Sequence, residues 1–159
     1  MFWKYFKYII RHKYYVAIAC FKRGLIWQGI IHDWTKFKPS EFYNYAVFFY
    51  GKGQINQKGD TISSGGNAEL KNKMELSWLR HVHANKHHWN YWIVVDRVGE
   101  IQIFDMPYKY IVEMVCDWEG VGKAIRGKDA NTIDWYERQK DTLMLSDNTR
   151  IQVESIIKD

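Results

Sequence analysis

Three residues near the start of the chain, His32, Asp33 and Lys36, carry side chains suited to metal and phosphate chemistry. Imidazole and carboxylate groups both bind divalent metal ions, and a nearby lysine can neutralise a phosphoryl group. If this stretch is helical, His32 and Asp33 are about 100° apart and can reach one ion. Lys36 then follows His32 by one turn on the same face. The sequence therefore predicts a metal site beside a phosphate-binding lysine.

Two further polar residues stand where a helical pattern calls for apolar ones. Residues 2–22 repeat apolar side chains at steps of four and three, and His12 falls on that stripe with Tyr5, Ile9, Val16 and Ala19. Asp117 is the only charged residue on the corresponding stripe of a helix predicted over 107–126. A single buried His or Asp is more often a hydrogen-bonded core residue. The metal hypothesis depends on several such residues lying on separate predicted helices.

A histidine-rich stretch continues the polar set. A helix predicted from Asn67 carries one stripe that begins apolar and becomes polar, made of Leu70, Met74, Trp78, His81, Asn85 and His88. The pattern predicts a helix that runs from the core into a site. Four of the six histidines lie between positions 81 and 88. The alternative is a metal-binding surface patch or a fortuitous basic turn.

The periodicity predicts an all-α fold, a single helical domain over residues 1–159 with about six to seven helices. We expect the helices at 2–22, 25–33, 40–50, from 67, and at 107–126, 132–145 and 148–157. No segment is a convincing strand, although a short extended piece is open at Ile101–Phe104. Residues 51–66 are rich in glycine and predict a surface loop, either a lid or binding loop or a tolerated insertion.

Charge and composition restrict the partners. The chain has 159 residues, a formal net charge of +5 and a pI of about 9.1, which favours an anionic partner. Nucleic acid is a weaker expectation than nucleotide because the basic residues are spread along the chain. Cys20 and Cys116 lie in apolar patterns and predict buried thiols in a reducing, cytoplasmic compartment. Basic residues interrupt the apolar N-terminus, so we expect no membrane span, with an in-plane membrane helix as the alternative.

The order His, His-Asp and a distant Asp resembles the HD superfamily of metal-dependent phosphohydrolases, in which H…HD…D supplies four ligands to one divalent metal inside a helical bundle. Carried over to this chain, the resemblance implies an HD-domain-like bundle with the metal ligands His12, His32, Asp33 and Asp117. Lys36 matches the lysine of the HDxxK form, which contacts phosphate or metal-bound water.

A second resemblance concerns the segments HDWTKF, HVHANKHHWNYW and CDW. They are similar to a small uncharacterised family of phages and bacteria with the pattern HDxxKF, HxxxNxHHWxYW and DW. This resemblance suggests a phage or mobile-element origin and places His81, Asn85, His87 and His88 in the site. His87 and His88 also resemble the paired histidines of the HD-GYP branch, which help to bind a second metal. The glycine-tyrosine-proline motif of that branch is missing from this sequence. The resemblance therefore does not decide whether a second metal ion is bound.

These patterns together predict a metal-dependent phosphohydrolase that cleaves a phosphoester or phosphodiester of a nucleotide or cyclic nucleotide. The ligand types suit Mn, Fe, Co, Ni or Zn, and Mg less well. The expected catalytic residues are Lys36, Asp33, His81 and His88. The expected substrate contacts are Lys36, Asn85, His87, Arg80 and Trp89. The alternative is a non-catalytic phage accessory protein that binds a nucleotide or a protein; a phage-encoded chain would act in the host cytoplasm.

Overall fold

The structure is a computed structural model that describes residues 1–51 and 68–158. The chain forms two compact units, namely unit 1, Met1–Arg11 with Asp33–Ala84, and unit 2, His12–His32 with Asn85–Asp159. The described residues contain seven α-helices and one small two-stranded sheet, which confirms the prediction of an all-α fold. The assignment of residues 1–159 to one domain stays a prediction.

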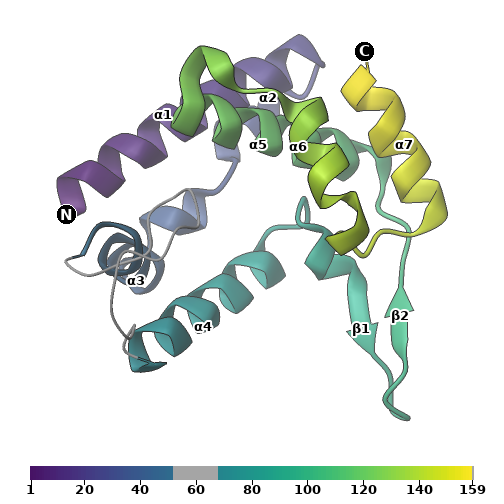
Figure 1. Ribbon diagram of the computed structural model, residues 1–159, viewed down its shortest axis with the longest axis horizontal. Coiled ribbons are helices and arrows are strands. Elements are labelled where there is room, and N and C mark those ends of the chain that lie inside the picture. Colours follow the sequence, from purple (N-terminus) through teal and green to yellow (C-terminus); the bar gives the residue numbers. More distant parts are fainter. Residues whose placement is uncertain (52–67, 159) are drawn as a thin grey trace. The chain divides into compact units, whose positions relative to one another are not determined.

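Unit 1 contains the first half of α1 (Phe2–Lys22), η1 (Trp34–Phe37), α3 (Pro39–Tyr50) and α4 (Ala68–Ala84). Pro39 occupies the first position of α3, where its missing N–H costs nothing. Helices α3 and α4 lie side by side (Figure 1), and Asn44 donates a 2.8 Å hydrogen bond to Ser77 between them. The buried core of the unit is aromatic and aliphatic, and consists of Tyr5, Ile9, Tyr45 and Ala46.

Unit 2 contains the second half of α1 and the remaining elements of the chain. They are α2 (Ile26–Ile31), η2 (Trp89–Trp92), β1 (Ile93–Val95), β2 (Ile101–Ile103), α5 (Tyr108–Arg126), η3 (Gly127–Asp129), α6 (Thr132–Gln139), η4 (Lys140–Thr142) and α7 (Asp147–Lys158). Every residue from 111 to 117 is buried, so α5 is covered on all sides along this part of its length. The core includes Cys20 and Cys116 as buried free thiols, as the sequence predicts.

A glycine sets the distance between α1 and α5 in unit 2. A Cβ atom added to Gly120 would lie 2.3 Å from Cγ2 of Val16 and 3.0 Å from its backbone nitrogen. The two helices therefore cross in backbone contact at this point, which no larger residue permits without movement. Val16 lies one helical turn after His12, and Gly120 lies nearly one turn after Asp117. The crossing thus brings these two polar residues together.

Helix α2 is anchored to the end of α1 in a similar way. A Cβ atom on Gly29 would lie 2.8 Å from the ring of Phe21, so α2 approaches α1 through its glycine. Lys13 adds hydrogen bonds to the carbonyl groups of Ile30, at 3.4 Å, and of His32. These contacts fix the C-terminal end of α2, from which the histidine of the His-Asp pair extends.

The prediction that the His-Asp pair is helical is wrong. Helix α2 ends at Ile31, earlier than the predicted limit of 33, and His32 has non-helical backbone angles of φ −48° and ψ 128°. Asp33 has a φ of 52° in the left-handed region, where it stands alone among the described non-glycine residues. A short polar side chain tolerates this conformation better than most. The pair is therefore positioned by a sharp break between α2 and η1.

The histidine-rich stretch also departs from its prediction. Helix α4 ends at Ala84, so Asn85 and His88 do not continue its stripe. The buried residues of α4 are Ser77, His81 and Val82, whereas Trp78, predicted to face the core, is 40% exposed. Residues 85–88 form a turn in which the amide of His88 donates to the carbonyl of Asn85 at 3.2 Å. The turn gives His87 and His88 directions that a helical extension would not.

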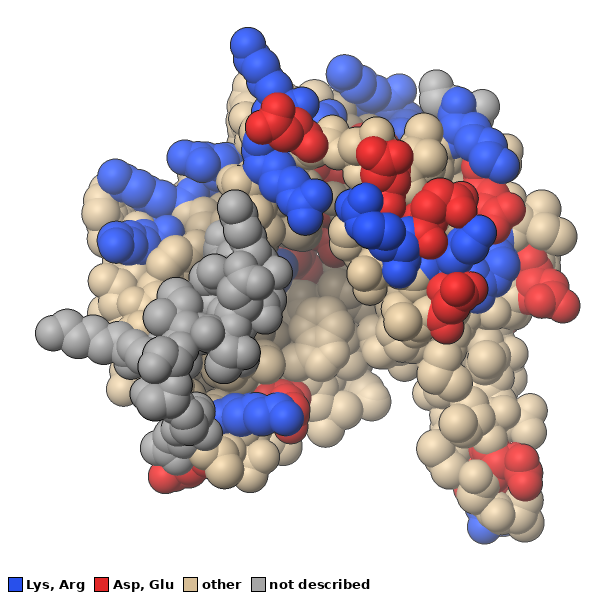
Figure 2. Space-filling view, in the orientation of Figure 1, with Lys and Arg blue, Asp and Glu red and all other residues tan. Residues whose placement is uncertain are grey.

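A β-hairpin was only half predicted. The extended piece at Ile101–Phe104 is confirmed as β2, but its partner β1 was not predicted. The strands are antiparallel, and Val94 lies opposite Gln102. The hairpin projects from unit 2 (Figure 1) and is mostly uncharged, with charged side chains near its tip (Figure 2). Asp96 closes the turn by accepting from the amides of Val98 and Glu100, both at 2.9 Å.

The remaining helix limits agree with the sequence to within a residue or two, except for α6. That helix ends at Gln139 and passes into η4, so the predicted helix over 132–145 is too long. The predicted loop over 51–66 lies almost entirely outside the described residues. None of the described helices has both the length and the apolar character needed to cross a membrane.

Candidate metal centre

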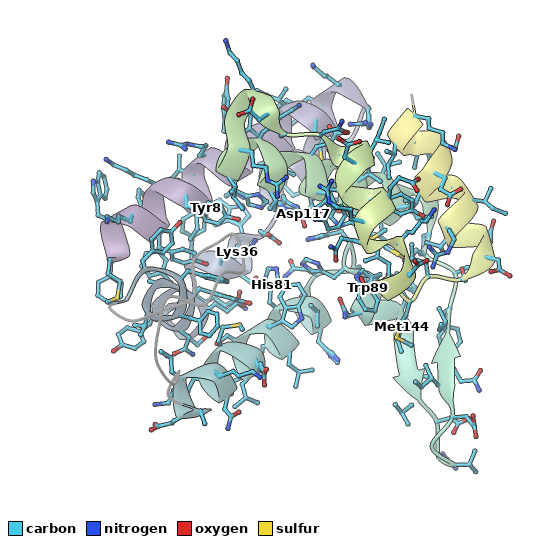
Figure 3. All side chains as sticks on the ribbon, in the orientation of Figure 1. Tyr8, Lys36, His81, Trp89, Asp117 and Met144 are labelled. Atoms are coloured by element: carbon cyan, nitrogen blue, oxygen red, sulfur yellow. The ribbon has the colours of Figure 1, made fainter. Side chains whose placement is uncertain are left out.

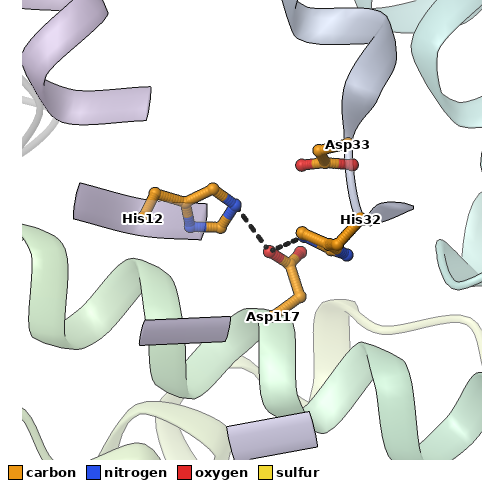
Figure 4. A group of neighbouring side chains, drawn as sticks. All are labelled: His12, His32, Asp33 and Asp117. Carbon is orange, nitrogen blue, oxygen red and sulfur yellow. Dashed lines mark hydrogen bonds and ion pairs between the residues drawn. The ribbon is translucent and has the colours of Figure 1, made fainter. Parts of the chain in front are cut away.

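One oxygen of the Asp117 carboxylate meets two imidazole rings in unit 2. Oδ1 of Asp117 lies 3.3 Å from Nε2 of His12 and 3.2 Å from Nε2 of His32 (Figure 4). The two imidazoles and the carboxylate come from α1, from the residue after α2, and from α5. His12 is 0% exposed, His32 1% and Asp117 6%. Three of the four predicted metal ligands, all of them buried, therefore converge on one point.

The other side of the His32 ring contacts a second carboxylate. Nδ1 of His32 lies 3.2 Å from Oε1 of Glu113, which is buried on α5 one turn before Asp117. The same oxygen lies 3.3 Å from Nδ1 of His87. An ionised carboxylate only accepts hydrogen bonds, so both Nδ1 atoms donate to it. In the neutral form of each ring, Nε2 is then left with a lone pair.

Two overlapping groups of possible metal ligands lie wholly within unit 2. They are His32 with His87 and Glu113, and His87 with His88 and Asp117; within each group the ligand atoms lie within 4.8 Å of one another. The ring centroid of His87 lies 4.5 Å from that of His32 and 4.1 Å from that of His88. His87 and His88 are both buried. Buried His, Asp and Glu side chains thus stand within metal-binding distance of one another.

Asp33 belongs to a polar cluster in unit 1. Its Oδ2 forms an ion pair with Nζ of Lys36 at 2.5 Å, and its Oδ1 lies 3.3 Å from Nε2 of His81. Lys36 comes from η1 and His81 from α4 (Figure 3). Nδ1 of His81 lies 3.0 Å from Glu41 and 2.9 Å from the hydroxyl of Thr35. Three members of this cluster, Asp33, Lys36 and His81, are site residues that the sequence predicted.

His81 is held between two carboxylates, and this changes its proton affinity. Burial by itself lowers the pKa of an imidazole. The negative charge of Asp33 and the hydrogen bonds to Asp33 and Glu41 outweigh that effect and raise the pKa of His81 above its ordinary value. The ring is therefore more readily protonated than a free histidine. A buried imidazolium of this kind is suited to donate a proton.

The pKa of Glu113 is shifted in the opposite direction, below its ordinary value. Burial raises the pKa of a carboxyl group, but the hydrogen bonds from His32 and His87 outweigh burial and lower the pKa of Glu113. The group therefore stays ionised near neutral pH. Its negative charge favours the tautomers in which Nδ1 of His32 and of His87 donates to it.

The remaining predicted site residues have different surroundings. Trp89 is half-buried against the hydrophobic core of unit 2, so it has a packing role there. Arg80 is exposed on α4, and Asn85 is half-buried just after the end of that helix. His88 is buried in unit 2 beside His87. None of these positions tests a contact with substrate.

Three site residues were not predicted, namely Glu113, Glu41 and Thr35. Glu113 precedes Asp117 by four residues, and this spacing places both carboxylates on one face of α5. That signal was available in the sequence. Glu41 lies in the first turn of α3 and is only 3% exposed. An acidic residue in a first helical turn is common at the surface, so its burial could not be read from the sequence.

Comparison with known proteins gives a family but no activity. The family DUF5662, described as a family of unknown function, matches residues 1–159. The chain belongs to this family. No curated protein and no solved structure matches it. The function of this DUF5662 member has therefore to be argued from the site.

Proposed function

We propose that this DUF5662 protein is a metal-dependent phosphohydrolase that cleaves a phosphoester or phosphodiester of a nucleotide or cyclic nucleotide. The observation that carries the proposal is the convergence of His12 and His32 on one oxygen of Asp117. With Nδ1 of His32 donating to Glu113, its Nε2 faces the Asp117 oxygen with a lone pair. Two lone pairs repel unless the ring is protonated or a cation lies between them. A divalent cation fits this donor set.

The chemistry of the donors narrows the choice of metal. Neutral imidazole with carboxylate suits Mn, Fe, Co, Ni or Zn, and Mg less well. When bound, the cation supplies Lewis-acid activation of water and neutralises charge on the phosphoryl oxygens. His12, His32 and Asp117 would hold it. Asp33 is the fourth ligand that the HD resemblance implies, and this assignment stays a prediction.

Glu113 has a supporting role in the same centre. By accepting from Nδ1 of His32 and of His87, it fixes the tautomer and the orientation of both rings. Ligand histidines in metal sites commonly donate their second ring nitrogen to a carboxylate in this way. His87 and His88, together with Asp117, are the residues that would hold a second ion.

The residues proposed for acid catalysis and for phosphate binding lie in the unit 1 cluster. His81, whose pKa is raised, is the proton donor to the leaving group. Lys36 exchanges its ion pair with Asp33 for the phosphoryl oxygens as substrate enters. His88 is a second candidate proton donor. Asn85, His87, Arg80 and Trp89 are the proposed contacts to the rest of the substrate.

The test combines elemental analysis with a turnover assay. The purified protein is analysed for bound transition metals and then incubated with mononucleotides, nucleoside triphosphates and cyclic dinucleotides in the presence of Mn, Co or Mg. We expect about one or more metal ions per chain and a dephosphorylated or linearised product. The variant His32→Ala should lose both, whereas His83→Ala, an exposed histidine on α4, should lose neither.

The outcomes separate the proposal from its alternatives. A protein that binds no metal, and in which His32→Ala changes nothing but stability, has satisfied core histidines and is not a metalloenzyme. A protein that binds metal and retains an unmodified nucleotide over hours is a binding protein. Product formation that requires His32 supports the proposal.

A further inference from the structure

The positive charge of the protein comes from its N-terminal segment. Residues 1–31 contain no Asp or Glu and six Lys and Arg residues, namely Lys4, Lys7, Arg11, Lys13, Lys22 and Arg23. Six of the 23 Lys and Arg thus lie here, which leaves 17 against 18 Asp and Glu in the rest of the chain. Over the first half of α1, Figure 2 shows Lys and Arg with no acidic side chain among them. This segment is strongly basic, whereas the remainder is close to neutral.

In unit 2, the same segment exposes large apolar side chains. Helix α2 has the sequence IWQGII, and Gly29 is its only buried residue. Ile26 is 52% exposed, Trp27 67% and Ile30 48%. Because α2 packs on α1 through Gly29, its large side chains are directed away from the core of the unit. A short helix with so much exposed apolar surface indicates a binding surface.

In unit 1, the first half of α1 repeats this composition. Phe2, Trp3, Phe6 and Ile10 are exposed there. The rings of Trp3 and Phe6 stack with centroids 5.6 Å apart, and Nζ of Lys7 lies 5.2 Å from the Trp3 ring. The part of the segment in each unit thus has exposed aromatic and aliphatic side chains among basic ones.

We propose that the N-terminal segment, residues 1–31, binds the surface of an anionic membrane. Helices that lie in the membrane interface combine aromatic and aliphatic side chains with Lys and Arg. Trp is favoured at the level of the headgroups, and Lys and Arg bind anionic lipids. A second copy of the chain fits less well, because two such segments would repel each other. Nucleic acid fits less well because it offers no apolar phase for Ile26, Ile30 and Ile31.

This inference is independent of the proposed hydrolase activity, and a lipid-binding experiment tests it. The full-length protein is sedimented with vesicles of phosphatidylcholine alone and of phosphatidylcholine with phosphatidylglycerol in equal amounts. We expect binding only to the anionic vesicles and a loss of binding at high salt. Replacing one basic residue, in Lys22→Ala, should weaken binding by about fivefold. Trp27→Ser should weaken it by about tenfold or more.

The control is Ile151→Ser, which changes a residue with the same 67% exposure as Trp27 but on α7, outside the segment. It should bind vesicles like the unchanged protein, and far-UV circular dichroism checks that all variants are folded. The proposal is overturned by equal sedimentation of Trp27→Ser and Ile151→Ser, or by no binding to anionic vesicles. It is also overturned if light scattering shows a dimer that Trp27→Ser abolishes, or if duplex DNA is bound more tightly than lipid.

Discussion

Two histidines, one in each unit, have nearly the same immediate contacts but different surroundings. His32 lies between Glu113 at 3.2 Å and Asp117 at 3.2 Å in unit 2. His81 lies between Glu41 at 3.0 Å and Asp33 at 3.3 Å in unit 1. Each ring therefore bridges two buried carboxylates. The groups beyond those carboxylates decide what each arrangement can do.

Around His81, the carboxylates are balanced by positive charge. Asp33 is paired with Lys36, and the raised pKa of His81 favours a second positive charge beside Glu41. Two carboxylates with an ammonium and an imidazolium are neutral overall. Such a cluster needs no ion to be stable in the interior.

Around His32, the carboxylates contact further imidazoles, whereas in unit 1 Asp33 contacts a lysine. Asp117 shares its oxygen with His12, and Glu113 shares its oxygen with His87. Neutral imidazoles leave two negative charges on the carboxylates, which matches one divalent cation. The same motif of a histidine between carboxylates is thus compatible with a metal site in unit 2, and we propose that it serves as a proton donor in unit 1.

Removing the central imidazole from each cluster should separate these roles most clearly. His32→Ala deletes a proposed metal ligand and should reduce metal affinity by more than about a hundredfold. His81→Ala should leave the affinity within about threefold, because its cluster is neutral without an ion. Isothermal titration with Zn and with Mn against a competing chelator measures both. Equal losses of affinity in the two variants would show that the two clusters do not differ in metal binding.

The buried positions of His12 and Asp117, two of the proposed metal ligands in unit 2, could be predicted from the sequence. The stripe of Tyr5, Ile9, His12, Val16 and Ala19 is buried as predicted, so periodicity alone placed His12 inside. Asp117 was found in the same way. Helical spacing works here because α1 and α5 are long and regular.

The rest depended on backbone breaks and on contacts between distant segments. The left-handed conformation of Asp33 and the end of α4 at Ala84 follow no local pattern, and they direct the side chains of Asp33 and His87. Glu113 and Glu41 are ordinary residues for a helix, and only their histidine partners reveal a role. A single sequence does not show which acidic residue a histidine will meet in the folded chain.

The α1–α5 crossing should be the next most sensitive point. A methyl group at Gly120 would meet Val16 at 2.3 Å, so Gly120→Ala should destabilise the protein by about 2–3 kcal/mol. It should also weaken metal binding, because the crossing brings His12 to Asp117, while leaving the contacts of His81 unchanged. Urea unfolding measures the stability, and the imidazole resonances of His81 report on unit 1.

Gly122→Ala is the matched control for this substitution. Gly122 lies in the same helix as Gly120, and its added Cβ would meet the side chain of Ala130 at 3.4 Å, which is an ordinary contact. Alanine has a higher helix propensity than glycine, so this variant should be as stable as the unchanged protein or up to about 1 kcal/mol more stable. If both glycine variants lose stability to the same extent, helix α5 is sensitive to any substitution, and the crossing has no special role.

Glu113 should have a smaller and more specific effect. Glu113→Gln removes the charge that holds the Nδ1 protons of His32 and His87, and should lower metal affinity by about 10- to 100-fold. In the metal-free protein, long-range proton–nitrogen correlation spectra should show both rings protonated at Nδ1, and this preference should weaken in the variant. Spectra that show Nε2 protonation in the unchanged protein would contradict the role given to Glu113.

The corresponding substitution in unit 1, Glu41→Gln, should change a pKa and leave metal affinity within about twofold. A raised pKa for His81 means that its protonated form stabilises the fold. This contribution is fully present below the ordinary pKa of 6.5 and is lost as the pH rises through the higher folded value.

Glu41→Gln removes one of the groups that raise the pKa of His81, so the loss of stability should begin at a lower pH. The control Glu75→Gln, at an exposed site on α4, should not shift this pH. Histidine resonances followed from pH 5 to 9 measure the change. A fall in metal affinity as large as that of Glu113→Gln would instead place Glu41 in the metal centre.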